Sequence, residues 1–180
     1  MKFSNIEIKA RCANQVKIRS MLESKKAVFK GIDHQVDTYF KVNSGRLKLR
    51  EGNIENYLVY YERENTKGPK ESDTILLPSD QKTNPNLKEI LLKSLGKLAQ
   101  VDKKREIYFI DNVKFHLDNV KDLGTFVEIE ARDPEGRVGK EKLLEQCKSY
   151  LDLFGIKKED LLAGSYSDMM LERKTKSKNS

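Results

Sequence analysis

Hydrophobic and polar residues alternate along much of the chain, which is the spacing of β-strands with one apolar and one polar face. In residues 124–133, GTFVEIEARD, one face carries Val127 and Ile129 while the other carries Glu128 and Glu130. Similar alternation, or a short apolar run, predicts strands at residues 3–12, 34–42, 46–51, 57–64, 74–78, 98–110 and 113–120. The chain is therefore expected to form about eight strands.

A helical spacing of apolar residues predicts helices at residues 14–26, 86–95 and 138–154. Asn14 is expected to cap the first of these helices, because its side chain can accept a hydrogen bond from an unpaired backbone N–H. Gly96 and Gly155 follow the last apolar positions of the other two helices and are expected to end them.

Two segments show neither the strand spacing nor the helical spacing of apolar residues. Residues 65–73, NTKGPKESD, are polar and rich in turn formers, so they are expected to form a mobile loop. Residues 171–180 are mostly basic and polar and are expected to be a flexible tail without regular structure. Residues 1–170 contain no linker and no repeat, and they are expected to form one domain.

The polar faces of the predicted strands carry charges, so the environment of those faces decides the fold. Each predicted helix has an apolar stripe that must cover a sheet, and the strands follow one another through short turns. These features favour an α+β fold, an eight-stranded antiparallel closed β-barrel with the helices outside and the charged faces inside. The alternative is an open antiparallel sheet whose charged face lies in water.

The composition of the chain limits which class of ligand and which cellular compartment are expected. The 180 residues carry a formal net charge of +7 and an isoelectric point near 9.2, which favours an anionic ligand such as a phosphate compound. The two cysteines, Cys12 and Cys147, lie far apart and suggest neither a disulfide framework nor a zinc site. No apolar run approaches the roughly 20 residues of a membrane span. The N-terminus has no apolar leader, so a cytoplasmic protein without membrane attachment is expected.

Basic side chains on the polar faces form the candidate anion-binding group: Arg46, Lys48, Arg50, Arg63, Lys103 and Arg105. Enclosing so many like charges without partners is costly, so a closed barrel is expected to hold a polyanion such as a triphosphate. Arginine would bind its oxygens through paired hydrogen bonds. Carboxylates in the same lumen would need a divalent cation beside that anion. Mg²⁺ or Mn²⁺ ligands are expected to be Glu7, Asp118, Glu128 and Glu130.

The order and spacing of several motifs resemble those of the CYTH superfamily, which contains class IV adenylyl cyclases and thiamine triphosphatases. They are NIEIK, HQVDTYF, GRLKLRE, VDKKREIYFIDNVKFHLDNVKDLGTFVEIEA and GSYSDMM, and together they cover residues 3 to about 170. The chain is most similar to the bacterial class IV adenylyl cyclase branch. This resemblance implies a triphosphate tunnel inside an eight-stranded antiparallel barrel, with basic residues on the triphosphate and acidic residues on the metal. It is also compatible with a homodimer.

The resemblance assigns roles near the N-terminus. The family's E-x-E-x-K signature falls on Asn5, Glu7 and Lys9, so an amide replaces the first carboxylate. An amide oxygen can still bind a cation but adds no charge, which affects metal affinity or choice. In triphosphatase members a lysine and a tyrosine orient the attacking water, and the matching residues are Lys9 and Tyr39.

The resemblance also bears on two later segments. Tyr61 stands where many members carry lysine, which leaves Arg63 and Lys70 as the phosphate-binding cations there. The family's terminal SY element matches Tyr166 and Ser167, which fit either a cap over the tunnel or packing in the last turn. His116 fits contact with substrate or a hydrogen-bonded structural role.

The expected function is metal-dependent chemistry on a triphosphate. The resemblance favours conversion of ATP to cyclic AMP and pyrophosphate, and the alternative is hydrolysis of the terminal phosphate of inorganic or thiamine triphosphate. A third hypothesis is a non-catalytic module that binds polyphosphate or the 5′-triphosphate end of RNA. Nucleic-acid binding is disfavoured because the aromatic residues fit core positions at least as well as base-stacking positions.

Overall fold

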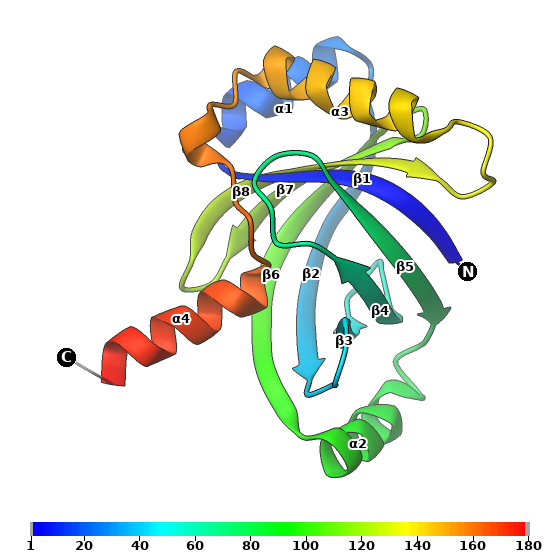
Figure 1. Cartoon of the computed structure of the whole chain (residues 1–180), viewed down its shortest axis with the longest axis vertical. Coiled ribbons are helices and arrows are strands. Elements are labelled where there is room, and N and C mark those ends of the chain that lie inside the picture. The colour runs from blue at the N-terminus through cyan, green and yellow to red at the C-terminus, as the bar shows by residue number, and fades with distance from the viewer. Residues whose placement is uncertain (1, 179–180) are drawn as a thin grey trace.

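Eight antiparallel strands form a closed barrel in a computed structural model that describes residues 2–178 (Figure 1). The strands are β1 (Lys2–Arg11), β2 (Val28–Phe40), β3 (Arg46–Glu51), β4 (Tyr57–Arg63), β5 (Lys70–Pro78), β6 (Lys97–Ile110), β7 (Val113–Val120) and β8 (Gly124–Asp133). Their order around the barrel is β1-β5-β4-β3-β2-β6-β7-β8, and β8 pairs with β1 to close it. The closed antiparallel barrel predicted from the sequence is thus confirmed.

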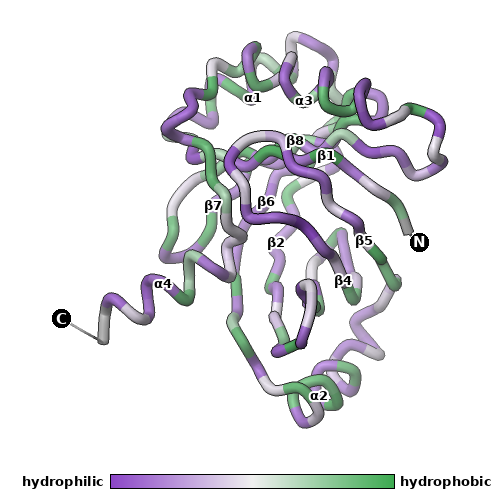
Figure 2. Tube along the Cα trace, viewed as in Figure 1, coloured by the Kyte–Doolittle hydropathy of each residue, from purple (hydrophilic) through white to green (hydrophobic). Residues whose placement is uncertain are grey.

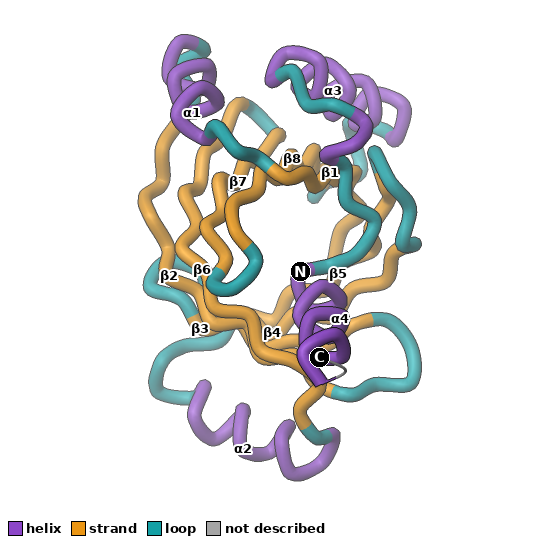
Figure 3. Tube along the Cα trace, turned by 90° about the vertical axis from the view of Figure 1, so that its left-hand side faces the viewer, coloured by secondary structure: helices purple, strands orange, loops and turns teal. Residues whose placement is uncertain are grey.

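The helices lie outside the barrel (Figures 1 and 3). They are α1 (Gln15–Ser24), α2 (Asn84–Leu95), α3 (Lys140–Phe154), a short 3₁₀ turn (Lys158–Asp160) and α4 (Tyr166–Lys178). The Asn14 side chain accepts a hydrogen bond from the Lys17 backbone N–H at 3.0 Å, as its N-cap role predicts. Within the described chain, none of the helices combines the length and the apolar character that crossing a membrane requires.

The main hydrophobic core lies between the outer face of the barrel and the helices α1 and α3. Ile8 and Ile129 from β1 and β8 meet Leu143 and Phe154 from α3 in this layer. Phe115 of β7 is fully buried and packs edge-on against Phe154, with ring centroids 5.7 Å apart. The apolar strand faces therefore point outward to the helices, which leaves the polar faces for the interior. Figure 2 shows the resulting mixture of hydrophobic and hydrophilic positions along the strands.

A second apolar cluster fills one end of the barrel. Tyr39, Val101 and Phe126 pack there with Tyr166, the first residue of α4. The Phe126 and Tyr166 ring centroids lie 4.9 Å apart. The start of α4 thus packs against this end of the barrel, beside the charged section.

Strand β5 begins within the segment that the sequence predicted to be a mobile loop. Residues 70–73 are paired with β1 and β4, so the loop prediction is wrong for them. Lys70, Ser72 and Thr74 are buried, whereas the alternating residues Glu71 and Asp73 are exposed. Both faces of this strand are polar because one meets an ionic interior and the other meets water, so no hydrophobic alternation marks it.

The C-terminal segment also differs from its prediction. Residues 171–178 continue the helix α4, so a tail without regular structure is wrong for them, while positions 179–180 lie outside the described residues. The first turn anchors the helix, because the Asp168 carboxylate accepts a 2.8 Å hydrogen bond from the Ser165 backbone N–H. Farther along, the Arg173 guanidinium donates to the Asp122 carbonyl.

Candidate active site

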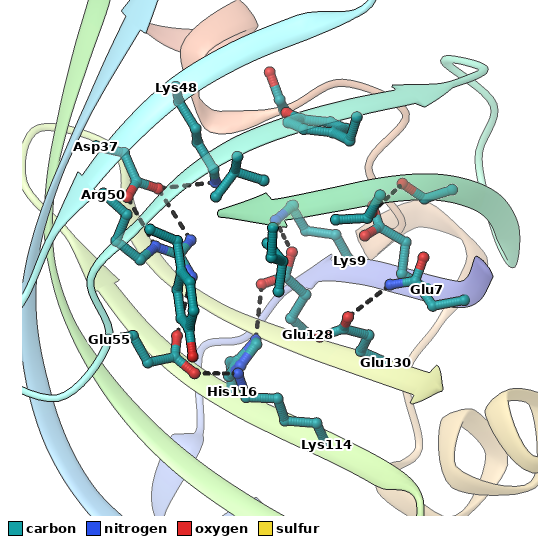
Figure 4. A pocket seen from close by; sticks show the side chains of 18 of the residues that line it. Glu7, Lys9, Asp37, Lys48, Arg50, Glu55, Lys114, His116, Glu128 and Glu130 are labelled. Atoms are coloured by element: carbon teal, nitrogen blue, oxygen red, sulfur yellow. Dashed lines mark hydrogen bonds and ion pairs between the residues drawn. The ribbon is translucent and has the colours of Figure 1, made fainter. Parts of the chain in front are cut away.

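The interior of the barrel holds a cavity of about 140 Å³ with a strongly ionic wall (Figure 4). In the described part of the chain, its lining contains eight basic side chains and five carboxylates. The basic ones are Lys9, Lys48, Arg50, Arg63, Lys103, Arg105, Lys114 and Arg132, and the carboxylates are Glu7, Asp37, Glu55, Glu128 and Glu130. The wall therefore has an excess of positive charge.

Asp37 of β2 gathers three of these cations. Its carboxylate accepts hydrogen bonds from Lys48 at 3.0 Å, Arg50 at 2.9 Å and Lys103 at 2.7 Å. Burial alone would raise the pKa of Asp37, but the charges of Arg50, Lys103 and Lys48 hold it well below the ordinary value. Burial lowers the pKa of Lys103 to about 7 in spite of this partner.

Glu55 extends the same network from the turn between β3 and β4. It accepts hydrogen bonds from Arg50 at 3.0 Å and from Gln35 at 3.2 Å, and it also binds Lys114. Although burial opposes ionisation, Lys114 and Arg50 keep the pKa of Glu55 far below its ordinary value. This role could not be predicted from the sequence, because Glu55 lies in the turn GNIEN, where no strand alternation shows which way a side chain points.

Glu128 of β8 gathers a second set of partners. Its carboxylate binds Lys9, accepts a hydrogen bond from Arg105 at 2.5 Å and lies 3.0 Å from Nδ1 of His116. Arg105 in turn donates two 2.6 Å hydrogen bonds to Asp118, which also accepts from the Tyr166 hydroxyl at 2.7 Å. Asp118 is fully buried behind Arg105 and does not line the cavity. Its position therefore suits orienting Arg105 rather than the predicted metal ligation.

His116 of β7 contributes a neutral group to this charged wall. Its side chain is 3% exposed, and its Nε2 atom is buried without a hydrogen-bond partner. Burial, followed by the charges of Arg105 and Lys114, lowers the pKa of His116 to about 3 despite the adjacent Glu128. The imidazole is therefore uncharged at neutral pH.

A cluster of oxygen donors lies where β1 and β8 pair. Glu7 and Glu130 are directly opposite each other in this pairing. The Asn5 amide donates a 2.6 Å hydrogen bond to Glu130, and its Oδ1 atom is buried with no partner. Within residues 2–178, no three His, Cys, Asp or Glu side chains form a metal-binding group, so the amide oxygen would be the third donor. Two carboxylates and an unpaired carbonyl oxygen fit a hard cation such as Mg²⁺ or Mn²⁺.

The cavity brings together most of the site residues predicted from the sequence. Besides Asp118, the exceptions are two predicted phosphate ligands, Arg46 and Lys70, which lie outside its lining. Arg46 donates to Asn65 at 2.8 Å and to Asp168 at 3.1 Å. Lys70 donates to three backbone carbonyls, those of Thr66, Leu162 and Ala163, at 2.9–3.3 Å. Lys70 thus connects the loop before β5 to the segment before α4.

The predicted pair of Lys9 and Tyr39 lines one cavity, but each residue has a different neighbour. The Lys9 ammonium lies 3.8 Å from the ring centroid of Tyr166. The Tyr39 hydroxyl lies 3.4 Å from Nζ of Lys48. Lys9 therefore has Glu128 and the Tyr166 ring as its partners.

The ion pairs change the electrostatic reasoning that came from the sequence. Unpaired cations were expected to require an anionic ligand, but Arg50, Lys103 and Arg105 are each paired with carboxylates inside the barrel. The barrel is therefore compatible with an empty interior. The excess of basic over acidic groups in its wall attracts anions.

Comparisons with known proteins agree on the fold. Residues 4–166 match the family model described as CYTH domain. The curated protein "Putative adenylate cyclase MJ0240" of Methanocaldococcus jannaschii is 26% identical over 185 residues, covering 91% of this chain and 97% of that protein. The PH1012 protein from Pyrococcus horikoshii OT3 superposes with a TM-score of 0.71 at 25% identity, covering 91% of this chain and 98% of that one.

A plant structure shares the fold at lower identity. It is the "Putative adenylyl cyclase HpAC1" from Hippeastrum, described as having a dominant triphosphatase activity. It superposes with a TM-score of 0.59 at 17% identity, covering 95% of this chain and 96% of that one.

Substitution of Asp37 tests the role of the internal ion pairs. Asp37→Asn leaves the buried Arg50 and Lys103 and the partly buried Lys48 without their shared carboxylate, so the free energy of unfolding is expected to fall by about 3–5 kcal/mol in urea denaturation. Glu135→Gln is the control, because its ion pair with Arg137 is exposed and its loss should cost less than about 1 kcal/mol. An equally small effect of Asp37→Asn would show that the internal pairs do not support the fold.

Proposed function

The chain belongs to the CYTH family, and from this membership and the cavity inside its barrel we propose that it is an enzyme that acts on a triphosphate. The observation that carries the proposal is the cavity wall, to which the described residues contribute eight basic and five acidic side chains. A phosphate chain offers several charged oxygens in a row, which suits cations contributed by strands all around a barrel.

Arg50 and Arg105 are the best-placed groups to bind phosphate oxygens. Each is fixed by two hydrogen bonds to a buried carboxylate, Arg50 by Asp37 and Arg105 by Asp118. A guanidinium held in this way is oriented before the ligand arrives, and it has further N–H groups to donate. Glu128 would release Arg105 or Lys9 as phosphate takes its place.

A divalent cation would be held by Glu7, Glu130 and Oδ1 of Asn5. Bound there, Mg²⁺ or Mn²⁺ would neutralise phosphate charge and polarise the phosphorus-oxygen bonds. Glu7 also binds Arg63, so the acidic and basic parts of the wall are adjacent at this point. The acidic part of the wall would orient the cation, and the basic part would orient the phosphate chain and stabilise its charge.

Hydrolysis of the terminal phosphate fits the cavity better than cyclisation does. A volume of about 140 Å³ suits a phosphate chain. It lies below the roughly 300 Å³ at which pockets for larger organic ligands begin, so the nucleoside that cyclisation requires would have to extend out of the cavity through its open side. The activity described for the Hippeastrum protein is of the same kind. The proposed substrate is therefore inorganic triphosphate or another compound with a terminal triphosphate.

Cyclisation of ATP to cyclic AMP and pyrophosphate is the second candidate. It is supported by the name of the Methanocaldococcus jannaschii relative, which matches this chain over 97% of its own length. This reaction needs the nucleoside at the mouth of the cavity and the ribose 3′-hydroxyl at the α-phosphorus. The phosphate chain would contact the same basic side chains, but it would be shifted along the cavity so that the α-phosphorus, rather than the terminal phosphorus, reacts.

Product analysis separates these candidates. Tripolyphosphate, thiamine triphosphate and ATP are each incubated with the protein and Mg²⁺ or Mn²⁺, and orthophosphate is the expected product. Glu7→Gln combined with Glu130→Gln should lower turnover at least about 10²-fold. The same variant should weaken Mn²⁺ binding measured by electron paramagnetic resonance, whereas Glu135→Gln should change neither.

Two other outcomes would contradict hydrolysis. Cyclic AMP and pyrophosphate as the main products would establish the cyclase instead. Triphosphate binding that survives the double substitution, without turnover by the unaltered protein, would establish a binding module.

Triphosphate binding should also take up protons. The pKa of Lys103 is lowered to about 7 by burial, so at pH 8 its side chain is mostly neutral before the ligand binds. An adjacent polyanion favours the charged form and raises that pKa. The complex therefore holds more protons than the free protein, and affinity should fall as the pH rises above 7.

Calorimetry in two buffers of different ionisation enthalpy measures this uptake. Tripolyphosphate keeps part of its last proton at pH 8 and releases it on binding, so the contribution of Lys103 is the difference in proton uptake between the unaltered protein and Lys103→Met. The unaltered protein is expected to take up more protons, by up to about one per ligand. Equal proton exchange in the two proteins would contradict the assignment.

A further inference from the structure

Glu55 holds two cavity cations from a turn rather than from a strand. One oxygen of its carboxylate accepts a 3.0 Å hydrogen bond from Arg50 and a 3.2 Å hydrogen bond from the Gln35 amide, and the other oxygen binds Lys114. A guanidinium, an ammonium and an amide N–H around one carboxylate are donors that would also suit a phosphate group. The protein therefore supplies an anion of its own at this point of the cavity wall.

The turn that carries Glu55 is fixed to the barrel by a buried carboxylate. Asp33 of β2 is fully buried and accepts hydrogen bonds from the backbone N–H groups of Ile54 at 2.9 Å and Glu55 at 3.0 Å. The turn is also closed on itself, because the Asn56 amide donates to the Gly52 carbonyl at 2.8 Å and accepts from the Gly52 N–H at 3.1 Å. Moving the backbone of Glu55 away from the cavity would break this set of hydrogen bonds.

The close packing of this turn explains its glycine. A Cβ atom at position 52 would lie 2.7 Å from an oxygen of the Asp33 carboxylate and 2.7 Å from the Glu55 carbonyl oxygen. Both distances are shorter than Cβ contacts in proteins, so a side chain at Gly52 would push the turn away from Asp33. The glycine thus permits one close position of the turn, and with it one position of the Glu55 carboxylate.

Glu55 lies across the cavity from the proposed cation site. Figure 4 shows Arg50 and Glu55 together on one side of the cavity, and Glu7 and Glu130 on the other. A phosphate chain that starts at the cation site and crosses the cavity toward Lys114 would meet the Glu55 carboxylate. The two anions would repel each other, and Lys114, the cation that could separate them, is already bound to Glu55. The chain is therefore expected to stop before this point.

We propose that Glu55 limits the length of the phosphate chain that the cavity accepts, so that the site selects triphosphate over tetraphosphate and longer chains. This inference rests on the proposed function and narrows its substrate class. The Glu55 carboxylate takes the position that a further phosphate group would need, and Arg50 and Lys114 neutralise it there. A fixed charge of this kind selects by excluding the longer chain, without a tighter fit to the shorter one.

Calorimetric binding of tripolyphosphate and tetrapolyphosphate tests the proposal, in the absence of metal ions so that metal-dependent turnover does not interfere. The unaltered protein is expected to bind tetrapolyphosphate no more tightly than tripolyphosphate. Glu55→Gln removes the charge at nearly constant size. The affinity for tetrapolyphosphate relative to tripolyphosphate should then rise at least about 10-fold, because the repulsion between like charges is gone. Glu135→Gln removes an exposed charge and should leave this ratio unchanged.

A crystal structure of the unaltered protein with tripolyphosphate tests the same point without any variant, since Glu55→Gln leaves Lys114 unpaired and could fold poorly. Glu55 is expected to keep both Arg50 and Lys114, with no phosphate group bound to Lys114. A phosphate group on Lys114 in place of Glu55 would overturn the inference.

The binding data have equally direct readings. Tighter binding of tetrapolyphosphate than of tripolyphosphate by the unaltered protein would overturn the inference, and so would an equal affinity ratio in the unaltered protein and Glu55→Gln. Absence of triphosphate turnover with Mg²⁺ or Mn²⁺ would instead refute the proposed function, and the affinity ratio would still decide the role of Glu55. Failure of the unaltered protein to bind either chain would refute both.

Discussion

The structure depends on carboxylates that hold cations inside a closed barrel. Asp37 and Glu128 each bind two or more basic side chains from other strands, so the interior is connected across the barrel by ion pairs rather than filled with apolar side chains. Charges are stable there only because nearly all of them are paired. The apolar strand faces then pack outward against α1 and α3, which is where the main core forms.

The apolar strand faces point outward and the charged faces point inward, and this arrangement explains which parts of the fold the sequence predicts. Strands with one apolar face, such as β1 and β8, were identified from their alternation, and closure followed from the need to cover that face. The first half of β5 was missed because residues 70–73 meet ions on one side and water on the other. Residues 171–178 were assigned to a tail because their composition is basic, although a capped and buried first turn anchors the helix.

The candidate site was predictable where it follows the strand period and not where it depends on contacts. The two-residue alternation along a strand is enough to predict that the side chains of Arg50, Lys103 and Glu130 point inward. Glu55 comes from a turn, and its contact with Lys114 exists only after the barrel closes. Asp118 also occupies an inward-facing position of its strand, but the Arg105 side chain lies between it and the cavity. No pattern in the sequence reveals this contact. Pairing geometry therefore decides which charges remain available to a ligand.

The central claim is that these paired interior charges bind a phosphate chain by exchanging partners. A crystal structure of the protein grown with tripolyphosphate and Mn²⁺ tests it most directly. The account predicts a phosphate chain inside the barrel, within hydrogen-bond distance of Arg50 and Arg105, with Glu128 having lost at least one cationic partner. A chain bound only to the outer surface, with every interior ion pair unchanged, would contradict it.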